Sequence, residues 1–245
     1  MIEDQLGHRT IREFRDQPVS EEVVELLGKV AMRTASSRGL QHAGIIRVRD
    51  MHKRQELARI GKQEYVARAP EYFLFIVDAH RSAGILQECG GDPQAACRAD
   101  VFVEGFTDAC LMAQNVVNAA EELGLGTNYL GNVQNDPLAV VRLLGMPKLT
   151  FPVVGLTFGY PAQDPQCKPR MDASLRMMVD EYRQPQSWVT ALADYDERMR
   201  TYYDLRDSGS PSDPFTQQVV HRIASPLQAN RTIAAAISQG FDLAG

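Results

Sequence analysis

The sequence predicts an α+β fold, with an α/β sandwich as the alternative. Predicted helices and strands are interleaved up to about residue 158, and after residue 188 only helices follow. A continuous apolar run at residues 72–77 is typical of a strand that is covered on both faces. The helix predicted over residues 99–123 is apolar on nearly all sides, which indicates a helix of the core or of a subunit interface.

The length predicts how the chain is divided. At 245 residues and 27.3 kDa, the chain fits one large domain or one domain with an arm. The tail reads as helices at about residues 188–206, 214–223 and 227–240, with too few strands for a second sheet. We therefore predict a core over residues 1–187 and a helical C-terminal excursion over residues 188–245, which packs on the core and on a partner subunit.

Helix caps and apolar runs define the other elements. Ser20 is placed to cap a helix whose first turn holds Glu21 and Glu22, and Asp136 to cap another that starts at Pro137. The first 17 residues are basic and partly helical in pattern. The remaining predictions, in chain order, are a strand at residues 45–48, a charged helix at 52–60, a loop at 79–98, and strands at 127–131 and 151–158.

Composition and missing motifs exclude several classes of protein. The net charge of −5 argues against a nucleic-acid binder, and no apolar run approaches the roughly 20 residues that span a bilayer. The start of the chain does not resemble a signal peptide, so we expect a cytoplasmic protein with free cysteines. Motifs of Rossmann dehydrogenases, P-loop NTPases, zinc hydrolases and serine esterases are absent, and the five histidines are scattered, so no metal site is expected.

Residues 8–15 concentrate positive charge in this acidic chain. His8 and Arg12 lie four residues apart, so one helical turn would aim both at the same point, with Arg9 between them. The Thr10 hydroxyl and the N–H groups of a helix start would complete an anion site. A solvated basic N-terminus is an equally good interpretation of this segment alone.

A second cationic point lies in the loop Lys168-Pro169-Arg170. Pro169 restricts the residue before it to extended conformations, so the lysine and the arginine project as fixed neighbours. An ordinary surface loop is the alternative. The two cationic segments could converge on one phosphate, which carries about −1.5 to −2 charges.

Three further segments could face a planar ligand. Ser36 and Ser37 lie in a stretch of small residues that would let such a ligand approach the backbone, although a plain loop fits equally well. Gln63 offers a donor and an acceptor. Gly131 permits close approach at a strand end that runs through Tyr129, Leu130, Gly131 and Asn132.

Five ordered motifs carry a family resemblance over about residues 7–206. They are HRTIREF, TASSRGLQ before a strand with IIRV, GKQEYVARAPEYF, AQNVVNAAEELGLGTNYLGN and GYPAQDPQCKPR. Together they resemble the nitroreductase / flavin reductase family, and within it the branch of oxygen-insensitive NADPH nitroreductases and NADPH–flavin oxidoreductases. The resemblance implies a nitroreductase-like sandwich with a central mixed sheet between helices, in a homodimer whose C-terminal arms embrace the partner.

The resemblance also implies an FMN site at the subunit interface. Positions matching His8, Thr10, Lys168 and Arg170 hold the phosphate, and those matching Ser36, Ser37 and Gln63 contact the ring. Arg12 would face the pyrimidine edge. The full cofactor-binding set is His8, Arg9, Thr10, Arg12, Ser36, Ser37, Gln63, Tyr129, Leu130, Gly131, Asn132, Lys168, Pro169 and Arg170.

The expected activity is that of an FMN-dependent NAD(P)H oxidoreductase with a ping-pong scheme. A hydride from NAD(P)H would reach FMN and then pass to a nitroaromatic, a quinone or a flavin, with Arg12 stabilising negative charge at N1 and O2. The alternatives are a flavin-binding or sensing protein with little turnover and an interaction protein that uses its basic arm.

Two departures from the family pattern concern nucleotide choice and the ring contact. Arg206 matches the first of the arginines that bind the 2′-phosphate of NADPH, but the following residues 207–213 carry two acids and no second arginine. The preference between NADPH and NADH is therefore open. Where relatives commonly have Gly-Gly, this chain has Gly131-Asn132.

Overall fold

The structure is a computed structural model that describes residues 2–202, 212–224 and 231–243. The chain divides into two compact units, of which unit 1 is Met1–Gln163 with Asn230–Gly245 and unit 2 is Asp164–Ala229. This division differs from the expected boundary after residue 187. It differs because the last helix, α11 (Arg231–Ser238), packs against elements of unit 1, where Ala235 and Ala236 are buried.

Unit 1 is built on a four-stranded sheet with the strand order β1-β2-β4-β3. The neighbouring strands all pair antiparallel. Parallel pairing, which the expected mixed sheet requires, is present among the described residues as two isolated bridges outside the four strands, between Thr10 and Thr127 and between Arg98 and Asp242. The strands are β1 (Ala43–Arg47), β2 (Glu71–Asp78), β3 (Gly126–Leu130) and β4 (Thr150–Gly159).

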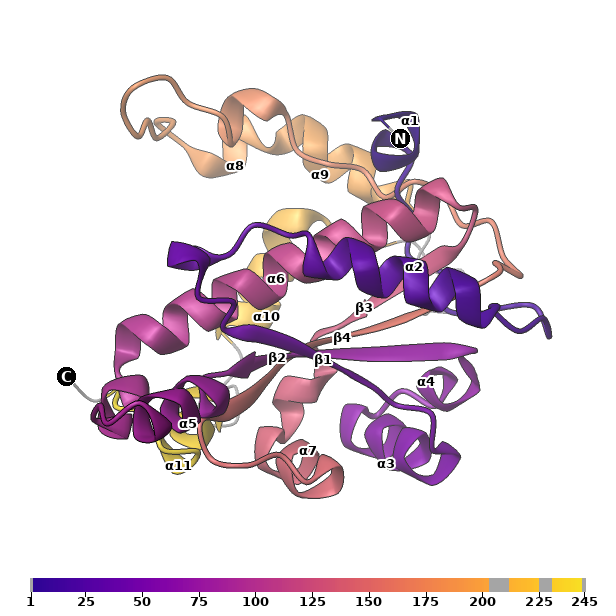
Figure 1. Ribbon diagram of the computed structural model, residues 1–245. Coiled ribbons are helices and arrows are strands. Elements are labelled where there is room, and N and C mark those ends of the chain that lie inside the picture. Colours follow the sequence, from indigo (N-terminus) through magenta and orange to yellow (C-terminus); the bar gives the residue numbers. More distant parts are fainter. Residues whose placement is uncertain (1, 203–211, 225–230, 244–245) are drawn as a thin grey trace. The chain divides into compact units, whose positions relative to one another are not determined.

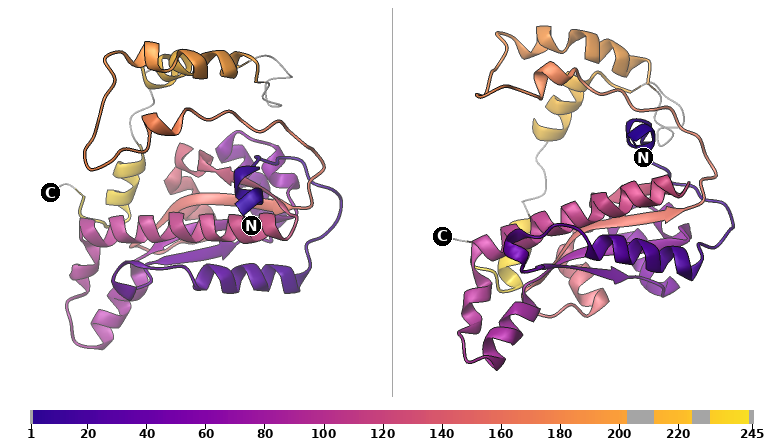
Figure 2. Two further views of the ribbon diagram at one scale, coloured as in Figure 1. Left: turned by 90° about the horizontal axis from the view of Figure 1, so that it is seen from above. Right: turned by 45° about the horizontal axis from the view of Figure 1, so that its top comes forward.

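Helices cover both faces of this sheet, as Figure 1 shows. One face carries α2 (Glu21–Met32) and α6 (Ala99–Glu122), and the other carries α3 (Met51–Gly61), α4 (Tyr65–Arg68) and α7 (Pro137–Leu144). This arrangement explains why every residue of β2 except Asp78 is buried. The α+β fold class is confirmed, and the two further views of Figure 2 show α6 running along the sheet.

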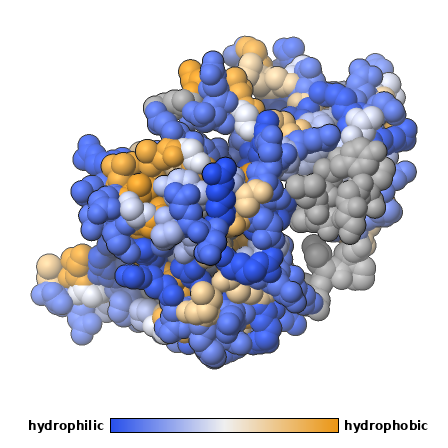
Figure 3. Space-filling model, turned by 90° about the vertical axis from the view of Figure 1, so that its right-hand side faces the viewer, coloured by the Kyte–Doolittle hydropathy of each residue, from blue (hydrophilic) through white to orange (hydrophobic). Residues whose placement is uncertain are grey.

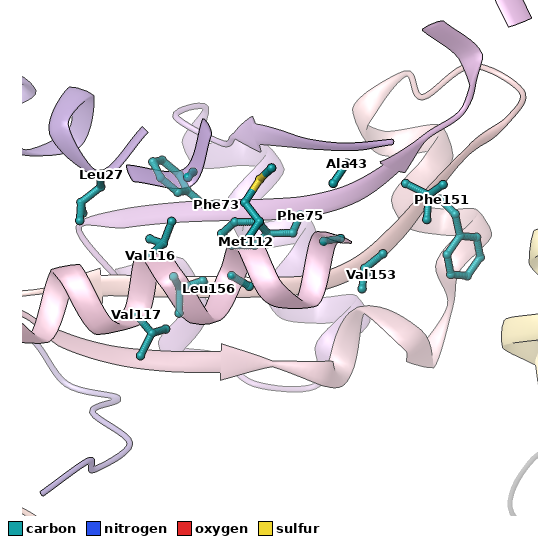
Figure 4. Packing of buried hydrophobic residues seen from close by; sticks show 14 of the residues in the cluster. Leu27, Ala43, Phe73, Phe75, Met112, Val116, Val117, Phe151, Val153 and Leu156 are labelled. Atoms are coloured by element: carbon teal, nitrogen blue, oxygen red, sulfur yellow. The ribbon is translucent and has the colours of Figure 1, made fainter. Parts of the chain in front are cut away.

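The main core lies between α6 and the sheet. Figure 4 shows Met112 and Val116 of α6 against Phe73 and Phe75 of β2 and Leu156 of β4. Each large apolar side chain buried in this way stabilises the fold by about 1.5–3 kcal/mol. The apolar helix predicted at residues 99–123 therefore packs as a core helix, and the residues that it carries have fixed positions.

The C-terminal end of unit 1 joins this core through aromatic contacts. The ring centroids of Phe102 and Phe241 lie 4.8 Å apart, and those of Phe102 and Phe151 lie 5.5 Å apart, both with edge-to-face geometry. Phe241 follows α11, so these contacts attach the C-terminal segment to α6 and β4.

Side-chain caps start the helices where the sequence predicts. The Ser20 hydroxyl accepts a hydrogen bond from the Val23 N–H at 3.4 Å, and the Asp136 carboxylate accepts one from the Ala139 N–H at 3.0 Å. The predicted loop at residues 79–98 is wrong, because it contains α5 (His80–Glu88) and the 3₁₀ helix η2 (Pro93–Cys97). Helix α5 has no side-chain cap and buries no residue, so the sequence shows neither a capping residue nor a buried apolar stripe for it.

The N-terminal segment is extended where a helical turn is expected. A short helix α1 (Ile2–Leu6) precedes it, and residues 8–15 then run beside β3 and the end of β4. The Ile11 N–H donates to the Thr127 carbonyl at 2.8 Å, and the Arg15 N–H donates to the Tyr160 carbonyl at 2.8 Å. These backbone groups bond to the sheet and are not available for a helix, so the predicted helical turn from His8 to Arg12 is wrong.

Unit 2 is a small helical body with its own apolar cluster. Leu192, Tyr195 and Met199 form the buried part of that cluster. Within the described ranges, no helix of the chain has the length and apolar character that crossing a bilayer requires. The helices of unit 2 are α8 (Trp188–Ala191), α9 (Ala193–Arg200) and α10 (Phe215–Ala224), preceded by the 3₁₀ helix η4 (Ala173–Leu175).

The contact between the N-terminal segment and β3 requires a glycine. A Cβ at Gly126 would lie 2.7 Å from the Cβ of Ile11, closer than packed side chains allow. We expect Gly126→Ala to lower the free energy of unfolding by about 1–3 kcal/mol because the segment must move away. Gly28→Ala is the matched control: a Cβ there meets no atom within 4 Å, so in helix α2 it should stabilise by about 0.5–1 kcal/mol.

Urea denaturation of the two variants and the unmodified protein measures both effects. Equal changes at Gly126 and Gly28 would contradict the close contact between Ile11 and β3.

Candidate functional site

The predicted site residues of the N-terminal segment lie together in an extended stretch of chain beside β3. Side chains alternate in an extended segment, so Thr10 and Arg12 lie on the side opposite to Ile11, which is buried against Gly126. The side-chain oxygen of Gln163 accepts hydrogen bonds from the Arg12 N–H at 2.6 Å and from the Glu13 N–H at 2.9 Å. The segment is therefore fixed by its backbone on both sides, while Arg9 beside Thr10 is half-buried.

His8 is oriented by a carboxylate. His8 Nδ1 lies 2.7 Å from Glu121 Oε1, and the Thr127 hydroxyl donates to the same oxygen at 2.6 Å. Because an ionised carboxylate only accepts hydrogen bonds, His8 Nδ1 is the donor. The second ring nitrogen, Nε2, donates to an anion when the imidazole is protonated, and Glu121 then balances part of that charge.

Ser37 is held by a buried acid of α6. Both the N–H and the hydroxyl of Ser37 donate to Asp108 Oδ1, each at 2.9 Å. Only 2% of Asp108 is exposed, so these two hydrogen bonds take the place of water at Oδ1. The predicted contact residue Ser37 is thus positioned by α6.

The loop that carries Ser36 and Ser37 has a strained backbone. Arg38 and Gln41 adopt left-handed conformations with φ of 52° and 55°, which side chains other than glycine rarely take. Arg38 pairs with Glu104 at 2.8 Å, and the Ser36 hydroxyl accepts a hydrogen bond from the Gln41 N–H at 3.3 Å. Strain of this kind persists where surrounding contacts impose it, and it is common at ligand sites. We refer to residues 36–41 as the serine loop.

The serine loop and the N-terminal segment lie at different points along α6. Asp108 holds the loop and Glu121 holds His8, and Glu121 comes thirteen positions after Asp108. At 1.5 Å per residue, this spacing is about 20 Å along the helix axis. Figure 1 shows the chain's N-terminal end and the loop after α2 at opposite ends of α6.

Gln63 and Asn132 form a pair of side-chain amides. Asn132 Nδ2 donates to Gln63 Oε1 at 2.8 Å, so the structure brings these two predicted residues together. Asn132 belongs to the 3₁₀ helix η3 (Gly131–Asn135), and Gln63 follows α3. Gly131 is exposed, and a Cβ built there would meet no atom within 4 Å, so the backbone beside the pair is open to a ligand.

The two residues before Gly131 have different environments. Leu130 is buried with 1% exposure, so only its backbone could face a ligand. The Tyr129 hydroxyl donates to Gln114 Oε1 at 3.1 Å. Burial, followed by the charges of Glu121 and Cys110, raises the pKa of Tyr129, so its phenol stays protonated.

The second cationic loop is anchored within unit 2. The Pro169 carbonyl accepts a hydrogen bond from the Tyr195 hydroxyl of α9 at 3.2 Å. Arg170 Nη1 donates to the Lys168 carbonyl at 2.9 Å, and Lys168 Nζ lies 6.0 Å from the ring centroid of Tyr202. The loop thus has a defined shape. Arg206 lies outside the described residues.

Sequence reasoning misses three residues that position the site: Glu121, Asp108 and Gln163. Asp108 has a recognisable signal, because it occupies a position in the buried stripe of α6 that also holds Val101 and Met112, where an apolar residue is the norm. Glu121 and Gln163 have no comparable signal. Their roles depend on how distant segments meet in the fold.

Comparison with known proteins gives a family for almost the whole chain. The Nitroreductase family model matches residues 6–160, and the model of the Nitroreductase family, C-terminal domain, matches residues 168–244. The chain is similar to the oxygen-insensitive NADPH nitroreductase of Salmonella typhimurium, with 37% identity over 89% of this chain and 88% of the relative. It is 34% identical to the NADPH-flavin oxidoreductase of Vibrio harveyi, over 91% and 90% of the two chains.

Solved structures agree with the sequence comparison. The structure of NfrA1 from B. megaterium aligns with a TM-score of 0.90 and 31% identity, covering 98% of each chain. The NADPH:FMN oxidoreductase from Vibrio harveyi, complexed with NAD+, aligns with a TM-score of 0.85 and 31% identity, over 98% and 97% of the two chains. Since fold, motifs and both family models coincide, the chain belongs to the nitroreductase family.

Proposed function

We propose that this protein is an FMN-dependent NAD(P)H oxidoreductase that passes a hydride from NAD(P)H to FMN and then to a nitroaromatic, quinone or flavin acceptor. The observation that carries the proposal is the similarity, over about nine-tenths of both chains, to relatives named as NADPH nitroreductase and NADPH-flavin oxidoreductase. A flavin sensor with little turnover is not favoured, because these relatives are named for reductase activity.

The donor set of the site fits FMN. A phosphate requires cationic and hydroxyl donors, and His8, Arg9 and Thr10 supply both within three consecutive residues. A flavin ring has hydrogen-bonding edges, and Gln63 and Asn132 supply side-chain amides beside the open backbone at Gly131. When bound, FMN supplies the ring that accepts and releases the hydride.

Several residues have defined tasks at the cofactor and the nucleotide in this proposal. His8, oriented by Glu121, donates Nε2–H to the phosphate, together with Lys168 and Arg170 from the loop anchored on α9. Arg12 directs its guanidinium at the N1 and O2 edge of the ring, where negative charge develops on hydride uptake. Its backbone is already fixed by Gln163, so little reorganisation is needed. Arg206 binds the 2′-phosphate of NADPH.

A second copy of the chain completes the site. The serine loop and the N-terminal segment are about 20 Å apart along α6 in one chain, so we propose that Ser36 and Ser37 contact the flavin held by the partner. Large apolar side chains of α2 and α6 are exposed, among them Met32, Val103 and Leu111. Figure 3 shows one face of the molecule on which hydrophobic patches lie between hydrophilic residues. Patches of this kind mark interaction surfaces.

The visible absorbance spectrum of the purified protein tests this function. We expect a yellow protein that bleaches when NADPH or NADH is added without oxygen and that recovers its colour with a quinone or nitroaromatic. The two bleaching rates also test the role of Arg206. A colourless protein that takes up no added FMN would contradict the proposal, and a yellow protein that does not bleach would favour the sensor.

We refer to His8, Thr10, Lys168 and Arg170 as the phosphate clamp, and its two residues in unit 2 allow a separate test. We expect Lys168→Ala and Arg170→Ala each to raise the Kd for FMN about tenfold or more, since each removes a charged donor worth about 1.5–3 kcal/mol. Arg183→Ala is the matched control, because Arg183 is an exposed arginine of the same unit. Fluorescence titration of the flavin-free protein with FMN gives the three constants. Unchanged Kd values in both clamp variants would exclude the clamp.

The role of Glu121 is tested by comparing it with its neighbour Glu122. We expect Glu121→Gln to raise the Kd for FMN about tenfold, because the hydrogen bond from His8 Nδ1 to a carboxylate, which orients the ring, becomes a weaker bond to a neutral amide. Glu122→Gln removes the same charge from an exposed neighbour and should leave the Kd within about twofold. Equal effects of the two variants would show that only the overall charge matters, and the same titration distinguishes these results.

A further inference from the structure

We propose that Asn132 is a positioning residue that fixes the side-chain amide of Gln63, so that the Gln63 Nε2 hydrogens and not its oxygen face the flavin. Asn132 Nδ2 donates to Gln63 Oε1 at 2.8 Å, and both side chains are half-buried. The inference rests on the proposed function, because it needs a flavin beside Gln63. It assigns a task to the asparagine where family members commonly have glycine.

The backbone of Gln63 is fixed by the end of α3. Lys62 takes a left-handed conformation with φ of 54° and ends the helix. The Gln63 N–H then donates to the Ala58 carbonyl at 3.0 Å. With the backbone held in this way, the direction of the Gln63 amide is decided by its side-chain torsions and by the partner that its oxygen finds.

Asn132 is held equally firmly against the same helix end. A Cβ on Gly61 would overlap the Asn132 side-chain amide, so the glycine provides the space in which that amide lies. Three residues later, Asn135 Nδ2 donates to the carbonyls of Ile60 at 3.3 Å and Gly61 at 3.4 Å. Between these two asparagines, Val133 is buried. Helix η3 is therefore docked on the end of α3, and the amide pair has little freedom.

The pairing gives Gln63 a fixed polarity. A glutamine amide carries an acceptor oxygen and a donor NH₂ group, and either one can face a ligand when the side chain is free to turn. Because the oxygen is bonded to Asn132, the NH₂ group is the part that remains for a ligand. A donor stabilises the negative charge that a flavin gains on reduction, so Asn132 favours the reduced flavin through Gln63.

Asn132→Asp reverses this polarity with almost no change of shape. A carboxylate only accepts, so Gln63 must donate its NH₂ group to it and turn its oxygen outward. We expect the equilibrium between oxidised and reduced flavin to shift about tenfold toward the oxidised form, which is about 30 mV for a two-electron couple. The midpoint potential is measured by spectrophotometric titration of the FMN-saturated protein against a dye of known potential.

Two controls distinguish the effect of turning the Gln63 amide from the effect of the negative charge that Asn132→Asp adds. Lys62→Gln makes the charge beside Gln63 more negative by the same one unit at an exposed side chain that bonds to neither amide, and it should shift the equilibrium less than twofold. In a Gln63→Leu background, Asn132→Asp should lose most of its effect, because no amide remains to turn. An undiminished shift in that background, or no shift in the single variant, overturns the proposal.

A readout without flavin distinguishes this inference from the proposed function. The side-chain NH₂ resonances of Gln63, identified by their loss in Gln63→Leu, should move in Asn132→Asp much further than in Lys62→Gln. If they move but the unmodified protein binds no FMN, the hydrogen bond between Asn132 and Gln63 exists, but the proposed function is wrong. The role of this pair at the flavin is then wrong as well. If they do not move, the positioning role itself is overturned.

Discussion

The packing of α6 along the sheet is the constraint on which the other features of unit 1 depend. Apolar side chains of this helix, such as Met112 and Val116, are buried against β2 and β4, so the helix cannot shift without exposing the core. The same helix carries Asp108 and Glu121, which bond to Ser37 and His8. Core packing and site geometry are therefore coupled through one rigid element.

A common arrangement recurs at the site, in which the residue expected to face the cofactor is oriented by a second residue behind it. Glu121 orients His8, Asp108 holds Ser37, and Asn132 bonds to Gln63. Gln63 is left with an NH₂ group for a ligand and His8 with its Nε2, whereas Ser37, whose hydroxyl hydrogen is donated to Asp108, can only accept a hydrogen bond from a ligand. Ligand binding then needs less ordering of side chains, and this is the usual benefit of a preorganised site.

The sequence predicts the elements with strong local signals and fails where the signals are tertiary. Ser20 and Asp136 start helices because their capping bonds are local. Helix α5 is missed because it has neither a cap nor a buried residue. The segment at His8 is interpreted as helical from spacing, but the edge of β3 captures its backbone, and no local pattern reports that competition.

The same division applies to the candidate site. The sequence is enough to propose Thr10, Gln63 and Asn132 as members of a donor set, because the chemistry of each side chain follows from its residue type. The partners that orient them are not, since Glu121 lies 113 residues from His8 in the chain and Asn132 lies 69 from Gln63. Only the buried acid Asp108 breaks a pattern visible in the sequence, within the stripe of apolar residues on α6.

The two acids of α6 also limit how this helix can change in evolution. Glu121 is thirteen positions after Asp108, and at about 100° per residue the two acids lie roughly 140° apart around the axis, so the helix contacts two segments on different sides. Inserting or deleting one residue between them would rotate one acid by about 100° and move it by about 1.5 Å. Exposed residues between them can therefore change in identity, whereas the buried ones, such as Met112 and Val116, are constrained by the core, and the length of this stretch is constrained by both acids.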